Sequence, residues 1–127
     1  MKKEMIMTLF SFILGIFFGA FATYLYMQFD INTKAEIFLM QGLNEFERKN
    51  YHKANEFYNM AIGLNFGDHG SHIFLGDSYK KIGLNNLAQE KYSIALKLNK
   101  ARDRLEIHDR NYILKQIDLL KEKEVKE

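Results

Sequence analysis

Residues 75–99 read LGDSYKKIGLNNLAQEKYSIALKLN, and the small and aromatic positions of this stretch also occur earlier in the chain at a fixed distance. Four such positions recur unchanged 34 residues apart: Gly42 and Gly76, Ala54 and Ala88, Tyr58 and Tyr92, Ala61 and Ala95. A period of this length is typical of antiparallel helix pairs that stack as a solenoid. The sequence therefore predicts an all-α fold with two consecutive helix pairs.

These positions resemble the tetratricopeptide repeat (TPR), in which a small residue on each helix allows close packing. The second copy holds nearly all of the residues that this family prefers: Leu75, Gly76, Tyr79, Gly83, Ala88, Tyr92 and Ala95. The first copy departs at Gln41, Glu45 and Lys49, where the family has Leu, Tyr and a turn Gly. The resemblance covers residues 35–102, and it implies a protein-binding domain without naming the partner.

Helices are expected at 34–48, 52–65, 70–82, 86–99 and 103–124. The resulting plan has a basic N-terminus (1–4), a transmembrane anchor (5–29), a linker (30–33), a first repeat (34–66), a second repeat (67–100), and a capping helix with a charged tail (101–127). Asp30–Thr33 has turn character, and Thr33 with Glu36 forms a candidate capping box. Asp68 is the expected cap of the third of these helices, and Gly83 suits a left-handed helix end.

The last expected helix keeps an apolar set of residues: Leu105, Tyr112, Ile113, Ile117 and Leu120. A third repeat in the same register would bury Asp109 and Arg110, which argues against a third repeat. This helix is instead predicted to close the open end of the solenoid, because a terminal helix needs a polar outer side. Residues 121–127 are expected to form a frayed tail.

The N-terminal stretch from Met5 to Phe29 contains no charged residue. Its 25 residues would reach roughly 37 Å as a helix, enough to cross the hydrocarbon core of a bilayer. Tyr24 and Tyr26 lie near one end, where aromatic rings favour the headgroup region. The sequence predicts a single-pass membrane protein anchored through residues 5–29.

A cleaved signal peptide is the alternative for this stretch. Lys2 and Lys3 form a basic start, and Ala20-Phe21-Ala22 matches a cleavage site. The apolar run continues for seven residues beyond Ala22, which favours an uncleaved anchor. For an anchor, Lys2 and Lys3 favour a cytoplasmic N-terminus with the repeat domain on the opposite side of the membrane.

Small residues recur at every fourth position within the expected span: Ser11, Gly15, Gly19 and Thr23. On a helix they would form one ridge, which allows another helix to approach closely in the bilayer. The alternative is that this ridge simply faces lipid.

Composition and motifs argue against several functional classes. The net charge is +2 and the charges are mixed in sign, so nucleic acid is not an expected partner. No phosphate-binding loop, nucleophile elbow or HExxH motif is present, and there is no cysteine. His69 and His72 with Asp68 lack a fourth metal ligand. We expect no enzymatic activity, no cofactor or metal, and no small-molecule substrate.

In TPR domains the first helix of each pair lines a concave face. The resemblance assigns eight residues to this predicted groove: Leu39, Leu43, Phe46, Glu47, Ile73, Asp77, Lys80 and Lys81. Leu39 and Leu43 stand where some family members have the Lys and Asn that clamp a carboxylate, so that clamp is absent. An apolar strip flanked by charges suits an amphipathic or apolar helix as ligand. The alternative is that the capping helix, the linker or a second copy covers this strip.

The sequence thus predicts a membrane-anchored module for protein–protein interaction, acting as a scaffold, adaptor or assembly subunit of a membrane complex. A secreted or periplasmic TPR binding protein, released by cleavage near Ala22, is the alternative. A purely structural accessory subunit is a third hypothesis.

Overall fold

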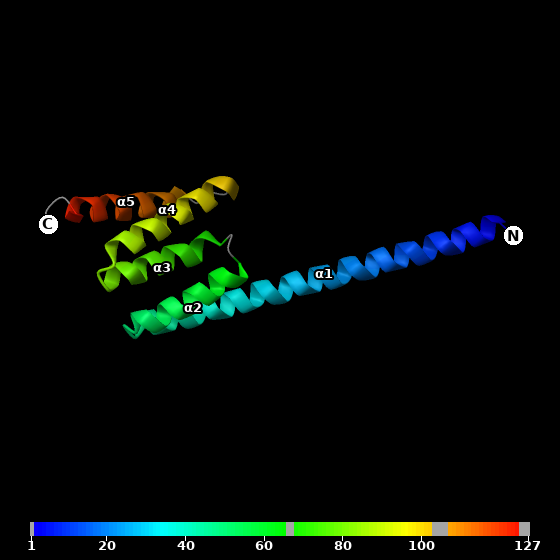
Figure 1. Cartoon of the computed structure of the whole chain (residues 1–127), viewed down its shortest axis with the longest axis horizontal. Helices are drawn as coiled ribbons and strands as arrows, with labels where there is room; N and C mark the ends of the chain where they lie inside the picture. The colour runs from blue at the N-terminus through cyan, green and yellow to red at the C-terminus, as the bar shows by residue number, and fades with distance from the viewer. Residues whose placement is uncertain (1, 66–67, 103–106, 125–127) are drawn as a thin grey trace. The chain divides into compact units, whose positions relative to one another are not determined.

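A computed structural model describes residues 2–65, 68–102 and 107–124 of the chain, and within them it is all-α (Figure 1). The helices are α1 (Lys2–Glu47), α2 (Tyr51–Leu64), α3 (His69–Lys81), α4 (Asn85–Arg102) and α5 (Ile107–Glu124). The chain forms two compact units, one ending at Thr33 and one beginning at Lys34. The second unit contains the two helix pairs that the sequence predicts.

Helix α1 passes through the region where the sequence predicts a linker. The expected turn at residues 30–33 is wrong, because these residues are helical. The side chain of Thr33 does not cap a new helix: its hydroxyl donates to the carbonyl oxygen of Phe29 at 2.9 Å. No Gly or Pro interrupts this stretch, so nothing in its sequence forces the helix to end.

The repeated small residues lie where helices meet. A Cβ atom added to Gly76 would lie 2.7 Å from Cε1 of Tyr92, and one added to Gly42 would clash with the ring of Tyr58. All four repeated alanines are buried, with at most 1% of their surface exposed: Ala54, Ala61, Ala88 and Ala95. Each Gly–Tyr pair joins the two helices of one repeat, which confirms the helix pairs.

The two repeats use equivalent turns. Gly83 has a φ of +81°, as expected for a left-handed helix end, and Lys49 at the matching position has a φ of 64°. The Asp68 carboxylate caps α3, accepting from the backbone N–H groups of Gly70 (3.2 Å) and Ser71 (2.9 Å). The expected cap of this helix is therefore confirmed.

Helix α5 packs on the second repeat with the apolar residues that the sequence assigns to it. Ile113 and Leu120 are fully buried, and Tyr112 and Ile117 pack against the same cluster. Leu105 lies outside the described residues. Helix α4 extends beyond its predicted end to Arg102, whereas α5 ends at Glu124, where its predicted range also ends. Residues 121–124 are thus helical rather than part of a tail.

Candidate functional site

The α1 members of the predicted groove are partly buried in the first repeat. Leu39, Leu43 and Phe46 pack against the core cluster formed by Ala54, Tyr58 and Leu75. Phe46 also meets the ring of Tyr51 edge to face, at a centroid distance of 5.3 Å. These side chains therefore contribute to the core as well as to the surface, and only part of each is accessible to a partner.

Ile73 is corrected from a groove residue to a core residue. Only 8% of its surface is exposed, and it clusters with Ala88 and Tyr92 of α4 and with Ile113 of α5. The sequence could not show this, because the cover comes from α5, which does not follow the repeat register. The capping helix thus covers this part of the predicted strip.

Asp77 accepts two hydrogen bonds inside the domain. Tyr92 of α4 and Tyr112 of α5 both donate to Oδ1 of Asp77, at 2.5 Å and 2.6 Å. Burial raises the pKa of both tyrosines above the ordinary value of 10.0, and the hydrogen bond to the Asp77 carboxylate raises it further. The carboxylate therefore links three helices. The sequence singled out Asp77 for its position in the groove but gave no sign of these partners.

Lys80 also contacts α5, since its Nζ donates to Oε1 of the buried Gln116 at 2.5 Å. A pocket of about 300 Å³ lies beside this contact, lined by Lys80, Leu119, Leu120, Glu122 and Lys123. Glu47 and Lys81, by contrast, are exposed. The predicted groove residues thus divide into partly buried α1 side chains, α3 side chains engaged by α5, and two exposed charges.

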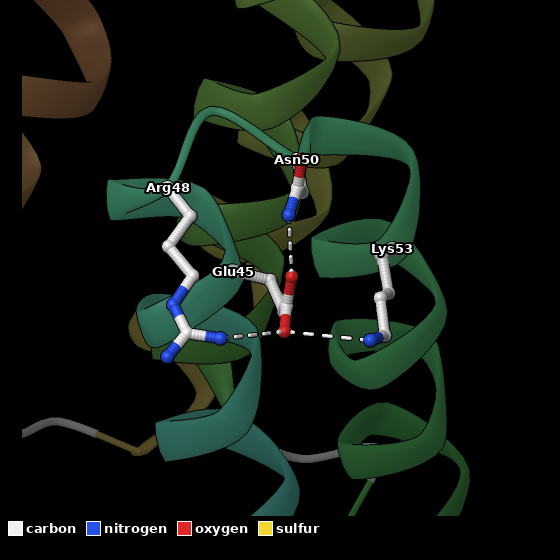
Figure 2. A network of polar contacts seen from close by, with 4 residues as sticks. All are labelled: Glu45, Arg48, Asn50 and Lys53. Atoms are coloured by element: carbon white, nitrogen blue, oxygen red, sulfur yellow. Dashed lines mark hydrogen bonds and ion pairs between the residues drawn. The ribbon is translucent and has the colours of Figure 1, made fainter.

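Glu45 anchors a polar network at the turn between α1 and α2 (Figure 2). Its carboxylate accepts from Nδ2 of Asn50 at 2.9 Å and pairs with Arg48 at 3.6 Å and Lys53 at 3.5 Å. The hydrogen bond from Asn50, and then the two cations, lower the pKa of this carboxyl below its ordinary value of 4.5. All four residues lie on one turn or its flanking helices, so the network stabilises the turn. The sequence showed Glu45 only as a departure from the repeat.

The histidines near the α2–α3 turn have structural partners. Nε2 of His69 lies 3.5 Å from Oδ2 of Asp109, a contact between α3 and α5. His72 is buried, at the position where the TPR family prefers Trp. Asp68 is occupied with the helix cap. Within the described ranges, no three His, Asp or Glu side chains gather in a way that could hold a metal ion.

Every residue from Lys2 to Phe29 is exposed, although most of this segment is apolar. Helix α1 is the one described helix that is long and apolar enough to cross a membrane, and a signal sequence would have the same properties. The small-residue ridge lies in this segment. A Cβ atom at Gly15 or Gly19 would meet nothing within 4 Å, and Thr23 donates to the carbonyl oxygen of Ala20 at 2.8 Å.

Comparison with solved structures supports the fold reached from the repeat. The chain is similar to a TPR domain of Arabidopsis OM64, with a TM-score of 0.63 and 17% sequence identity. The match covers 76% of this chain and 73% of that one. No family model matches the sequence, and no curated protein matches it either. The chain therefore has a TPR-like fold, and at this identity the likeness concerns the fold alone.

Proposed function

We propose that this protein is a membrane-anchored module for protein–protein interaction, serving as a scaffold, adaptor or assembly subunit of a membrane complex. One observation carries the proposal: a wholly exposed apolar segment and a TPR-like domain occur in the same short chain. Apolar surface of that extent needs a cover, and lipid supplies one without a further protein. A helical repeat domain without a catalytic motif is suited to binding other proteins.

Residues 5–29 serve as the anchor in this proposal. The exposure of every residue in the segment and the absence of any charge within it support this role. Lys2 and Lys3 favour a cytoplasmic N-terminus, with the repeat domain on the other side of the membrane. The ridge from Ser11 to Thr23 is then available for a helix of another membrane protein.

The partner site proposed for the repeat domain centres on α1. Leu39, Leu43 and Phe46 keep part of their apolar surface accessible. Glu47 and Lys81 are exposed, carry opposite charges and hold matching positions of the two repeats, 34 residues apart. An amphipathic helix would fit this combination, with its apolar side on the leucines. Asp77 and Lys80 bond to α5, and in this proposal they fix the position of α3 rather than contact the partner.

Carbonate extraction and the intact mass of the purified chain test the anchor. We expect the full-length chain in the membrane fraction, and a soluble chain beginning at Thr23 would establish the cleaved alternative. Leu14→Arg places a charge near the centre of the span, at a cost of about 2.5–3.5 kcal/mol for insertion. It should weaken membrane retention, whereas Leu14→Phe, as the matched control, should not.

The partner site is tested by exchanging its flanking charges, Glu47→Lys with Lys81→Glu, which leaves the net charge unchanged. Both side chains are exposed, so the fold should be retained, while recovery of bound proteins from detergent extracts should fall. Lys115→Glu on α5 is the control for a general charge effect. Unchanged recovery with the exchanged pair would place the contact elsewhere.

A further inference from the structure

One face of α1 is exposed, whereas the equivalent face of α3 in the second repeat packs against another helix. The residues of this face follow the spacing i, i+3, i+4, i+7, and we call them the outer α1 face: Ile37, Met40, Gln41 and Asn44. All four are exposed, with 51% of Ile37 and 65% of Met40 accessible. The repeat offers an internal comparison for this face, because each residue has a counterpart 34 positions later.

The counterparts on α3 are Ser71, Phe74, Leu75 and Ser78, and the last three of them contact α2. Leu75 is fully buried against Ala54 and Tyr58, and Phe74 stacks on Tyr58 at a centroid distance of 6.0 Å. Ser78 is also fully buried, and its hydroxyl donates to the carbonyl oxygen of Tyr51 at 3.2 Å.

This face of the repeat is therefore a surface for helix stacking. In the second repeat the helix that fills it is α2, whereas no described helix fills it in the first repeat. In a solenoid each helix packs on the one before it. Helix α1 is the first helix of this stack, so the outer α1 face is the surface on which a preceding helix would pack.

We propose that the occupant is a second copy of this chain, which presents the same outer α1 face across a two-fold axis. Ile37, Met40 and Asn44 have the a, d, a spacing of a two-stranded coiled coil, in which one Asn at an a position fixes the pairing. The face carries no charge, so two copies meet without repulsion. The amide groups of Gln41 and Asn44 both donate and accept, so each can pair with its own copy.

The opposite end of the domain does not offer a matching surface. Helix α5 closes it and exposes Leu114 and Leu119 together with charged residues: Arg110, Lys115, Asp118 and Lys121. Stacking the outer α1 face of one copy on α5 of the next would bury these charges without partners, which is unfavourable. The symmetric contact through α1 is therefore favoured over a head-to-tail chain of copies.

The pair is held weakly by this face alone. A stable interface buries about 800 Å² on each partner, from some 20–30 residues, and four side chains of one helix supply less than that. Confinement to the same membrane raises the effective concentration of the second copy. The affinity between the two copies therefore depends on the proposed anchor, whereas the geometry of the contact through α1 does not.

The test uses the absence of cysteine from the chain, since single-cysteine variants then have no background. Gln41→Cys lies on the outer α1 face, and the control Lys115→Cys is exposed on α5. Each full-length variant is reconstituted at low density in phosphatidylcholine vesicles and oxidised. We expect Gln41→Cys to form covalent dimers at least about tenfold faster than the control, because its two cysteines meet more often in the proposed pair than by random collision in the membrane. Equal rates, or no dimer from either variant, would overturn the proposal.

Ile37→Glu with Met40→Glu, added to Gln41→Cys, should return the rate to that of the control, while the helix content by circular dichroism stays unchanged. Gly15→Leu in the same background tests the membrane ridge. If Gly15→Leu abolishes the dimer and the glutamates do not, the contact belongs to the ridge and the proposal fails. Vesicle flotation measures separately whether the chain is bound to the membrane. If the chain does not float, the same comparison at high protein concentration in solution decides the pairing.

Discussion

The hydroxyl of Tyr92 donates a hydrogen bond of 2.5 Å to Oδ1 of Asp77, and the same arrangement is missing in the first repeat. Tyr58 is the counterpart of Tyr92, but Leu43 stands where the second repeat has Asp77. Among the described residues, the buried Tyr58 hydroxyl has no hydrogen-bond partner. Two residues that match in sequence therefore differ in their energetic role.

We expect opposite effects when each tyrosine loses its hydroxyl. Tyr92→Phe removes a hydrogen bond to a charged acceptor and should lower the free energy of unfolding by about 1.5–3 kcal/mol. Tyr58→Phe removes an unsatisfied buried donor, so stability should be unchanged or higher. Urea unfolding of the full-length chain in detergent, followed by circular dichroism, measures both. Equal losses for the two variants would contradict the difference between the repeats.

The network around Glu45 makes stability depend on pH in the acid range. The pKa of Glu45 is lower in the folded state than its ordinary value of 4.5, so the unfolded chain binds more protons as the pH falls below that value. The stabilisation is therefore complete above about pH 4.5 and is lost as the pH falls through the lower, folded-state pKa.

Glu45→Gln should reduce stability at pH 7 and flatten this acid dependence. Glu36→Gln on the exposed side of α1 is the matched control and should keep the acid dependence of the original chain. The urea midpoints of the three proteins are compared between pH 3 and pH 7, because this interval covers the pH range in which carboxyl groups titrate. An unchanged slope in Glu45→Gln would mean that another carboxyl group controls the acid range.

The thermal midpoint should change in opposite directions when the left-handed residue of each repeat turn is substituted. Lys49 has a φ of 64°, a conformation that costs a side-chain-bearing residue about 1–2 kcal/mol relative to the right-handed region. Lys49→Gly should therefore raise the thermal midpoint, although the greater freedom of glycine in the unfolded chain offsets part of the gain. Gly83→Ala, at a φ of +81°, should lower the midpoint. A fall in both variants would contradict this account.

The repeat positions were predictable because they depend on spacing alone. Gly42, Gly76 and the buried alanines face partner helices at intervals that the chain itself repeats, so their packing could be anticipated. The N-terminal cap of α3 was also local, since Asp68 bonds to residues two and three positions away.

The candidate groove was predicted less well, because its environment depends on α5. The contacts of Ile73 with Ile113, of Asp77 with Tyr112 and of Lys80 with Gln116 join residues 35–40 positions apart, outside the repeat register. The expected turn at residues 30–33 was wrong for a different reason. Asp30–Thr33 resembles a turn in composition, but none of these residues prevents a helix from continuing.

The burial of Ile73 leads to the last prediction. The side chain is 92% buried between α3, α4 and α5, so Ile73→Ala should cost about 2–5 kcal/mol through lost contacts and the cavity left behind. Ile37→Ala is the matched control on α1, where half of the side chain is exposed, and it should cost far less. Thermal unfolding of the full-length chain in detergent compares the two, with the original protein as reference. If Ile73→Ala is as stable as Ile37→Ala, helix α5 does not hold Ile73 in the core, and the side chain is accessible to a partner in the groove.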